Sequence, residues 1–496
     1  MKTRRDFLLD SVRDSIGLGA AMLLPTKIMA GELPADITEL SASDLSAAIR
    51  QREVSCTEVM QAYLPRIHRY NPIYNAIVSL VDDDELLSQA SAADQELARG
   101  NYRGWMHGMP HAIKDVRGAA GLPFTSGSPI FADRIAETDH PLAARIRAAG
   151  AIFIGKTNVP EFGLGSQSYN PVFGATGSAW NPALTSGGSS GGAACGLGTH
   201  MLPIADGSDT MGSLRNPGAF NSVIGFRPSI GLMSAQQPGE RSISTTGPMG
   251  RNTRDAIRLL QTLAVKPVPD NFNPANLTDV KIGWMGNLNG YLAMESGVTD
   301  LCEASLSSLN TAGVTVEATQ PQFSLTDLWQ AWTTIRHSAR TSYRRYYDDP
   351  KMRSLLKPEL VWEIEQSMIL TDADREVANR IRANWYRELD RLFGEYDFLA
   401  LPSAQVFPYP KEIHWPQEIA GRQMDTYHRW MEVVILGSLG GIPVINLPVG
   451  FDQQGRPMGM QIMGRFGADQ QVLEFALAYE AVTDHLQRRP ELVAAL

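Results

Sequence analysis

The sequence has little of three features that mark specialised classes of protein. It holds only three cysteines, Cys56, Cys195 and Cys302, which are far apart and odd in number. That excludes a disulfide framework and the close spacing of a zinc site, and predicts small buried hydrophobes instead. No apolar run reaches the roughly 18 residues of a membrane span, so no stable membrane insertion is expected. The net charge is −9 and no dense Lys/Arg run is present, so nucleic acid is not an expected partner.

The N-terminus has the pattern of an export signal. Residues 3–8 read Thr-Arg-Arg-Asp-Phe-Leu, and a short apolar run follows at residues 16–24. A twin arginine before such a run is typical of Tat-type signals. The alternative is a cytoplasmic N-terminal helix, which the acidic Asp10 and Asp14 favour. We expect residues 1–34 to be a signal segment of a periplasmic or secreted protein, and a cytoplasmic location otherwise.

The first half of the remaining chain alternates between strand and helix patterns. Ser55 and Glu58 form a capping box that predicts a helix running to near Tyr70, with a kink at Pro65 and a stop at Asn71-Pro72. Further along, residues 111–114 and 151–154 are short apolar strands, and a helix between them begins at Pro141 and ends at Gly150. Such alternation, which continues to about residue 260, predicts an α/β layered domain.

The second half begins differently. Residues from about 290 to 430 are rich in Trp, Arg, Tyr and Glu with helical periodicity, which predicts a mostly helical insertion that covers one side of the sheet. Residues 441–450 and 458–463 then read as two neighbouring strands, and residues 468–486 as a final helix. We expect residues 35–496 to form a single catalytic domain.

Two serines in glycine-dense loops and one lysine in an apolar strand are the strongest chemical signal. Residues 187–192 read Gly-Gly-Ser-Ser-Gly-Gly, and residues 206–215 read Asp-Gly-Ser-Asp-Thr-Met-Gly-Ser-Leu-Arg. Glycine allows backbone N–H groups to approach a ligand closely, and serine supplies a nucleophilic hydroxyl. Burial of Lys114 would make it a neutral base, whereas the alternative is a structural pair with Asp115. Together these residues predict acyl transfer without histidine.

Other motifs compete with this interpretation. Residues 150–157 match the phosphate-loop pattern, but their centre, Ala-Ile-Phe-Ile, favours a buried strand and not the flexible turn that nucleotide binding requires. Gly187 to Gly191 also satisfies the nucleophile elbow of Ser-His-Asp esterases, in which Ser189 would attack with the help of His428 or His485. A plain Gly/Ser linker is a third interpretation, weakened by the apolar, helix-compatible sequence that follows.

The same residues resemble the amidase signature family. The likeness rests on Lys114-Asp115, on residues 187–192 and on residues 207–215, and it extends over about residues 38–487. It is weak between about 265 and 430, where members of the family differ in substrate. The resemblance implies a single α/β/α-layered domain around a mixed β-sheet, with the helical insertion as a cover. It also implies an amidase that hydrolyses carboxylic amides and needs no metal and no cofactor.

The resemblance further implies a role for each site residue. Ser213 would be the nucleophile, Ser189 a bridging serine held by a cis peptide bond, and Lys114 the base. The backbone N–H groups of the oxyanion hole would come from Thr210, Met211, Gly212 and Ser213. Supporting roles fall to Ser190, Asp209 and Arg215.

One position departs from the family pattern, since Met211 stands where members usually have glycine. Its amide N–H remains, so the change bears on the size of the substrate more than on the reaction. The substrate is expected to be a small-molecule or peptide amide, and a homodimer is compatible with the sequence. Aromatic residues of the insertion are candidates for the acyl pocket, although packing between helices explains most of them equally well: Trp329, Trp332, Tyr343, Tyr427 and Trp430.

Three alternatives to a free-standing amidase stay open at this point. One is the esterase that uses Ser189, and another is the glutaminase-type subunit of a tRNA amidotransferase, which works inside a complex. The third is a binding protein on an inactive amidase scaffold, which the presence of all three triad residues disfavours.

Overall fold

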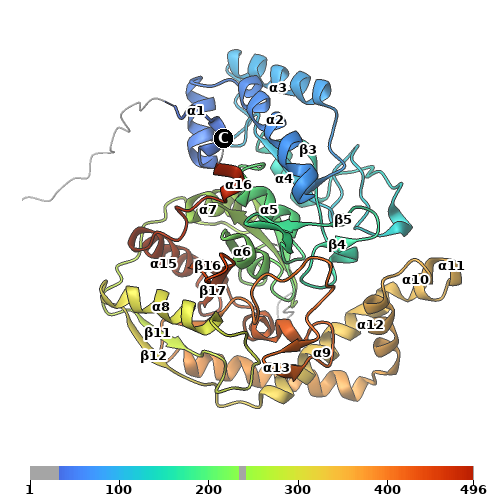
Figure 1. Ribbon diagram of the computed structural model, residues 1–496, viewed down its shortest axis with the longest axis vertical. Coiled ribbons are helices and arrows are strands. Elements are labelled where there is room, and N and C mark those ends of the chain that lie inside the picture. The colour runs from blue at the N-terminus through green and yellow to red at the C-terminus, as the bar shows by residue number, and fades with distance from the viewer. Residues whose placement is uncertain (1–32, 234–241, 495–496) are drawn as a thin grey trace, which may run out of the picture. The chain divides into compact units, whose positions relative to one another are not determined.

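The computed structural model describes residues 33–233 and 242–494 (Figure 1). Almost all of the expected signal segment, residues 1–34, lies outside the described residues. Asp36–Leu496 form one compact unit. Within the described ranges, no helix is both long and apolar enough to span a bilayer.

The core of this unit is an eight-stranded mixed sheet in the order β12-β11-β13-β17-β16-β9-β10-β8. β11 runs parallel to β12 and β13, and the other neighbours pair antiparallel. The predicted mixed sheet is therefore confirmed. Its strands are β8 Ala205–Asp209, β9 Ile224–Arg227, β10 Thr245–Gly250, β11 Lys281–Trp284, β12 Thr315–Ala318, β13 Phe398–Pro402, β16 Val444–Phe451 and β17 Pro457–Met463.

A smaller sheet carries the lysine of the candidate site. β1 (Ile77–Val78), β3 (Ile152–Thr157) and β2 (Pro110–Lys114) pair in that order, with β2 and β3 parallel. β2 lies against β8, since Asp206 of β8 accepts a hydrogen bond from the Lys114 backbone amide. Because residues 152–157 are a buried strand, the phosphate-loop pattern does not form a nucleotide-binding turn.

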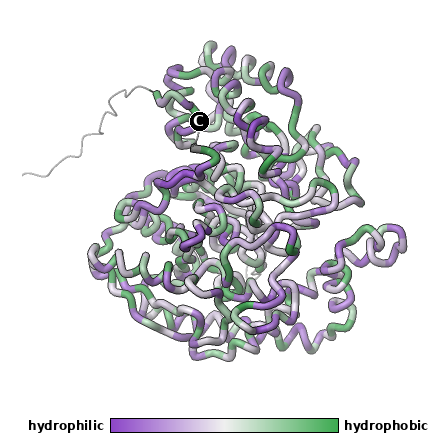
Figure 2. Tube along the Cα trace, viewed as in Figure 1, coloured by the Kyte–Doolittle hydropathy of each residue, from purple (hydrophilic) through white to green (hydrophobic). Residues whose placement is uncertain are grey.

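Helices cover the sheets on both sides, and the N-terminal ones stand at the top of Figure 1. Figure 2 shows hydrophobic and hydrophilic residues alternating along them, as expected of helices that bury one face. The helices outside the insertion are α1 Ala42–Gln51, α2 Cys56–Tyr74, α3 Asp83–Ala98, α4 Pro141–Ala148, α5 Gly191–Gly198, α6 Arg215–Asn221, α7 Thr253–Leu263, α8 Val298–Asn310, α14 Ile435–Gly440, α15 Asp469–Val482 and α16 Glu491–Ala494. Short two-stranded pairings complete the fold: β4 Tyr169–Asn170 with β5 Gly174–Ala175, β6 Gly177–Ser178 with β7 Asn181–Thr185, and β14 Glu418–Ile419 with β15 Arg422–Gln423.

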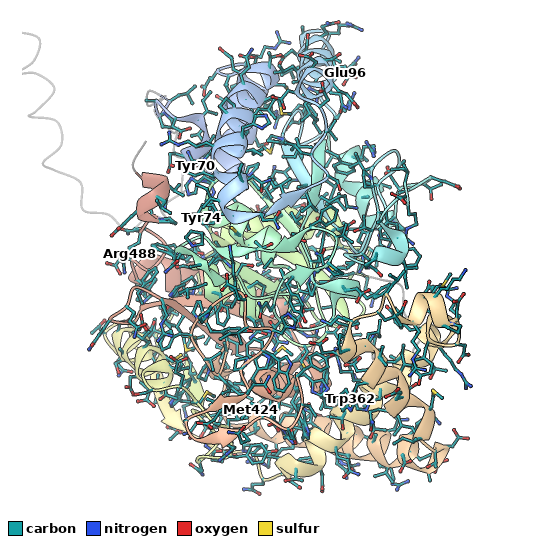
Figure 3. The ribbon with its side chains drawn as sticks, turned by 45° about the vertical axis from the view of Figure 1, so that its right-hand side comes forward. Tyr70, Tyr74, Glu96, Trp362, Met424 and Arg488 are labelled. Carbon is teal, nitrogen blue, oxygen red and sulfur yellow. The ribbon has the colours of Figure 1, made fainter. Side chains whose placement is uncertain are left out.

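α2 confirms one expectation and corrects another. The capping box between Ser55 and Glu58 is formed. The helix does not stop at Asn71-Pro72, however, but continues to Tyr74 and ends at Asn75 in the left-handed conformation. Each proline removes only one backbone donor, and a buried apolar face that includes Tyr70 and Tyr74 (labelled in Figure 3) keeps the helix intact.

The predicted helical insertion is narrower than expected. Its helices, gold to orange in Figure 1, are α9 Leu325–Ser338, α10 Arg344–Tyr347, α11 Pro350–Arg353, α12 Pro358–Ile369 and α13 Asp372–Leu392. β12 and β13 lie inside the predicted range of 290–430 and belong to the central sheet. β13 is buried along its whole length, so its short apolar run carries no periodicity that would mark it as a strand. All three cysteines are buried and free, as predicted for small hydrophobes.

Candidate active site

Lys114 ends strand β2 and points its ammonium group into a cluster of serine hydroxyls. Its Nζ lies 2.9 Å from Ser189 Oγ, 2.7 Å from Ser190 Oγ and 2.9 Å from Ser208 Oγ. The side chain is buried, with 1% of its surface exposed. A buried lysine surrounded only by hydroxyl groups has lost its water without gaining a carboxylate partner.

This environment changes the protonation of Lys114. Burial, and next the positive charge of Arg117, lower the pKa of Lys114 to about 7, while Asp206 and Asp209 act weakly in the opposite direction. The amine can therefore exchange a proton near neutral pH.

The alternative pair between Lys114 and Asp115 is not formed. Asp115 instead accepts hydrogen bonds from the backbone and side chain of Thr125 and lies 3.7 Å from the Nζ of Lys156. Burial raises the pKa of Asp115 despite the charge of Lys156. The two adjacent residues point into separate networks, and Lys114 stays with the serines.

The loop that carries Ser189 connects β7 to α5 and is buried throughout, so it is not a solvated linker. The peptide bond between Gly188 and Ser189 is cis. The carbonyl of Gly188 accepts a hydrogen bond of 2.6 Å from Ser166 Oγ. Further on, a Cβ at Gly192 would lie 2.3 Å from the backbone nitrogen of Asn158, so only glycine fits there.

The histidines that an esterase would need are engaged elsewhere. His428 Nδ1 lies 2.7 Å from Thr426 Oγ1, and His485 Nε2 lies 3.3 Å from Ser305 Oγ. Ser189 receives its hydrogen bond from Lys114 instead. The geometry therefore favours the lysine over a histidine as the base.

Ser213 lies in the loop between β8 and α6, at the wall of a cavity of about 830 Å³. Ser189, Ser208, Thr210 and Met211 line the same cavity. Ser213 keeps 7% of its surface exposed and Ser189 keeps 3%, so both hydroxyls are reached from the cavity and from little else. The two glycine-dense loops and the lysine are thus brought to one place.

Asp209 holds the Ser213 loop from below. Its carboxylate accepts hydrogen bonds from the backbone amides of Gly212 (3.0 Å) and Leu214 (3.2 Å). Arg215 binds it through two nitrogens, Nε at 3.0 Å and Nη2 at 2.9 Å. Burial alone would raise the pKa of Asp209, but the charges of Arg215 and Arg227 outweigh it and lower the pKa.

Asp209 also limits which amides can face the cavity. The Gly212 amide already donates to Asp209, and Gly212 has φ +79°, which turns its N–H away from the direction of its neighbours. The expected four-amide oxyanion hole is thereby reduced to Thr210, Met211 and Ser213 as candidates. The Met211 side chain is 3% exposed and packs into the hydrophobic core while it contacts the cavity.

The far wall of the cavity comes from the helical cover. Of the five aromatic candidates, only Tyr343 lines the cavity. The other four are buried with at most 7% of their surface exposed, as packing between helices requires: Trp329, Trp332, Tyr427 and Trp430. Tyr343 contacts Phe162 edge to face at 5.1 Å between ring centroids, and this aromatic pair narrows the entrance.

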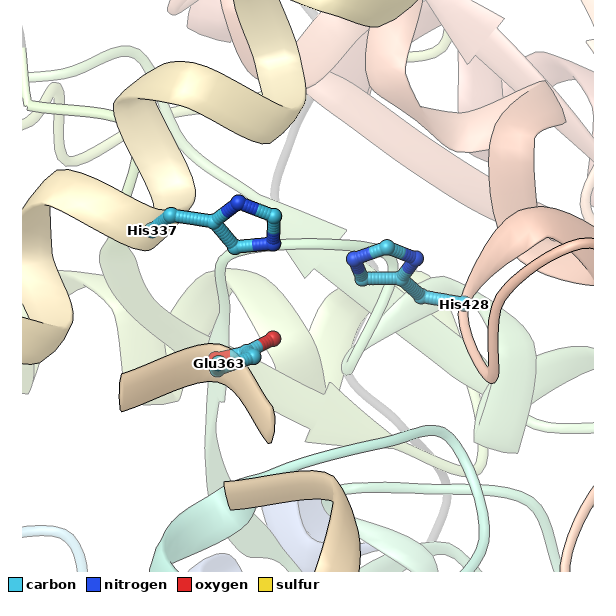
Figure 4. A group of neighbouring side chains, drawn as sticks. All are labelled: His337, Glu363 and His428. Atoms are coloured by element: carbon cyan, nitrogen blue, oxygen red, sulfur yellow. The ribbon is translucent and has the colours of Figure 1, made fainter. Parts of the chain in front are cut away.

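A buried cluster behind this wall has the composition of a metal site. His337, Glu363 and His428 have ligand atoms within 4.8 Å of one another (Figure 4). The Glu363 carboxylate, however, lies 2.5 Å from Arg336 Nε and 2.6 Å from Arg340 Nε. Two guanidinium groups on the one anionic ligand oppose a divalent cation, so the residues fit an ion-pair network better than a metal centre.

Sequence reasoning missed several residues of the site. Ser208 contacts Lys114 Nζ although it had been assigned no role, and its place in β8 between Gly207 and Asp209 was the available signal. Arg117 follows Lys114 by three residues and lines the cavity, as does Arg145 of α4. No motif marks either arginine.

Comparison with known proteins places these features in a family. The Amidase family model matches residues 58–473. An acylamidase from Rhodococcus erythropolis is 29% identical over 91% of this chain and 97% of its own length. The matching component of a glutamyl-tRNA(Gln) amidotransferase from a Cyanothece species is also 29% identical, over 91% of this chain and all of its own length.

Solved structures agree with the sequence comparison. A bacterial aryl acylamidase of the amidase signature family superposes with a TM-score of 0.84 at 24% identity, covering 92% of this chain and 99% of its own. A peptide amidase from Stenotrophomonas maltophilia reaches a TM-score of 0.73 at 26% identity, over 91% of this chain and 98% of its own. The fold is shared along nearly the whole chain.

Proposed function

The chain belongs to the amidase signature family, and from that premise we propose that it is an amidase that works through Ser213, Ser189 and Lys114. Enzymes of this family hydrolyse carbon–nitrogen amide bonds. The observation that carries the proposal is the buried Lys114 amine at 2.9 Å from Ser189 Oγ, beside a cavity that also exposes Ser213.

Acylation begins with a proton relay. A neutral amine has two N–H bonds and one lone pair, so Lys114 can donate to Ser190 and Ser208 while its lone pair takes the proton of Ser189. Ser189 takes the proton of Ser213, and Ser213 Oγ attacks the carbonyl carbon of the amide. The carbonyl oxygen becomes an oxyanion, which the amides of Thr210, Met211 and Ser213 would stabilise by hydrogen bonds.

The same relay then runs in reverse. The ammonium of Lys114 returns its proton through Ser189 to the nitrogen of the leaving group, and the carbon–nitrogen bond breaks to release ammonia or an amine. The acyl group remains on Ser213 as an ester. A water molecule, deprotonated by the relay, attacks this ester, and Ser213 recovers its proton as the acid departs.

The nucleophile can be identified directly. Ser213→Ala should reduce amide hydrolysis by roughly 10⁴-fold or more, because no other group takes its part in the covalent step. A fluorophosphonate probe followed by peptide mapping should label Ser213 and leave Ser189 unlabelled. Wild-type turnover in Ser213→Ala, or labelling of Ser189 alone, would contradict the mechanism.

A second candidate is the catalytic component of an amidotransferase complex, favoured by the similarity to the Cyanothece protein over its full length. Such a component would depend on a partner for its activity. Purification as an active protein without any partner would exclude this candidate. The export signal expected at residues 1–34 supports the free-standing amidase, and fractionation of cells that express the full chain tests it.

A further inference from the structure

Basic side chains dominate the charged groups of the cavity. Five arginines line it, and none of its lining residues, all within the described ranges, is an aspartate or glutamate. The arginines come from two opposite walls: Arg117 and Arg145 beside the small sheet, and Arg336, Arg340 and Arg382 in the helical cover. A concave site with charge of one sign concentrates ligands of the opposite sign.

Glu363 does not neutralise the helical wall. It is one carboxylate placed between Arg336 and Arg340, at 2.5 and 2.6 Å, so the three groups together keep one positive charge. Burial alone would raise the pKa of Glu363, but these two guanidinium groups outweigh it and lower the pKa, which keeps the carboxylate ionised. The neighbouring histidines add no charge, since burial lowers the pKa of His337 to about 4 and that of His428 well below its usual range.

The opposite wall has even less compensation. Neither Arg117 nor Arg145 has a carboxylate within 4.0 Å among the described residues, and the buried Nε of each lacks a hydrogen-bond partner there. The carboxylate that acts on Arg117 electrostatically is Asp206, whose Oδ1 is taken by His111 and by the Lys114 amide. Buried guanidinium nitrogens without partners are unfavourable in the free protein and gain from an incoming acceptor.

We propose that this cavity selects amides that carry a carboxylate, and that Arg117 and Arg145 are the residues that bind it. The inference rests on the proposed amidase function and names the substrate class of that site. Apolar side chains between the two walls, including Leu142, Phe162 and Ile335, leave room for a hydrocarbon portion between the carboxylate and the amide.

The test uses pairs of amides with the same shape and different charge. Succinyl 4-nitroanilide and 4-methylpentanoyl 4-nitroanilide differ only in that an isopropyl group replaces the carboxylate on the acyl side. N-benzoylglycine and N-isobutylbenzamide make the same exchange on the amine side. In at least one pair, we expect kcat/KM to favour the carboxylate by roughly ten- to a hundredfold, the range of a charged hydrogen bond.

Arginine variants assign the preference to its residues. Arg145→Gln and Arg117→Gln should each bring the ratio of kcat/KM within a pair towards one. Any effect of Arg117 on Lys114 acts on both members of a pair and cancels in that ratio. The matched control is Arg147→Gln, on the same helix as Arg145 but bound to Asp139 at 2.7 Å and absent from the cavity lining; it should leave the ratio unchanged.

A binding measurement separates this inference from the proposed mechanism. By calorimetry, the Ser213→Ala protein should bind succinyl 4-nitroanilide at least tenfold more tightly than its neutral partner, and Arg145→Gln in that background should remove the difference. Selective binding without hydrolysis by the wild type would overturn the amidase proposal and support the site. Equal or weaker binding of the carboxylate in both pairs would overturn the inference, whatever the turnover.

Discussion

Asp209 and Glu363 each lie between two arginines, but they do so in different surroundings. Asp209 is in the sheet, under the Ser213 loop, and both of its partners, Arg215 and Arg227, are fully buried. Glu363 is in the helical cover, and its partners Arg336 and Arg340 line the cavity.

The hydrogen bonds of the two carboxylates differ accordingly. Asp209 also binds two backbone amides, and Arg215 continues from it to the Val434 carbonyl, Gln461 and Ser438. Glu363 Oε2 and Arg340 Nε are close together without the geometry of a hydrogen bond. A charge triplet tied to the backbone positions a loop, whereas one that faces a cavity keeps capacity for a ligand.

The largest effect should follow from Asp209→Asn. It removes one charge between two buried guanidinium groups, and breaking a buried pair typically costs about 3–5 kcal/mol. We expect the free energy of unfolding, measured by urea denaturation, to fall by that amount, and amide hydrolysis to fall with it because the Ser213 loop loses its anchor. The control Asp372→Asn removes a carboxylate whose side chain is 97% exposed beside Arg375, and should change stability by less than about 1 kcal/mol. An Asp209→Asn protein as stable as this control would contradict the structural role.

A smaller loss of stability should follow from Glu363→Gln. The amide can still accept from Arg336 and Tyr427, and Arg340, with 14% of its side chain exposed, can turn to water in the cavity. We expect the free energy of unfolding to fall by about 1–3 kcal/mol, which is the range for hydrogen bonds to charged groups. The comparison fails if Glu363→Gln destabilises the protein as much as Asp209→Asn does in the same urea titration.

The two regions also differ in how far the sequence predicts them. Lys114, Ser189 and Ser213 could be brought together in advance because glycines mark their loops and an apolar strand marks the lysine. The Glu363 cluster unites three separate helical segments, none of which contains a motif. Local patterns reveal which residues can do chemistry, but they do not reveal which distant side chains share a wall.

Element boundaries show the same limit. α2 continues through Pro72 because tertiary packing outweighs the loss of one hydrogen bond, and β13 is concealed inside a helical range because its five residues are uniformly buried. The reduction of the oxyanion hole depends on the hydrogen bond from the Gly212 amide to Asp209, which no sequence pattern encodes.

The last prediction concerns Arg117, which joins the two sides of the comparison by acting on Lys114 and lining the cavity. As a base, Lys114 must be neutral, so kcat/KM rises with pH through its pKa of about 7 and then reaches a plateau. The positive charge of Arg117 lowers this pKa, and Arg117→Gln should therefore raise it and move the acid limb to higher pH. With the neutral 4-methylpentanoyl 4-nitroanilide as substrate, activity should fall at pH 6 and stay close to wild type on the plateau, whereas Arg147→Gln should leave the whole profile in place. A limb that stays in place, or moves to lower pH, would show that the charge of Arg117 does not act on Lys114 and that the two roles are separate.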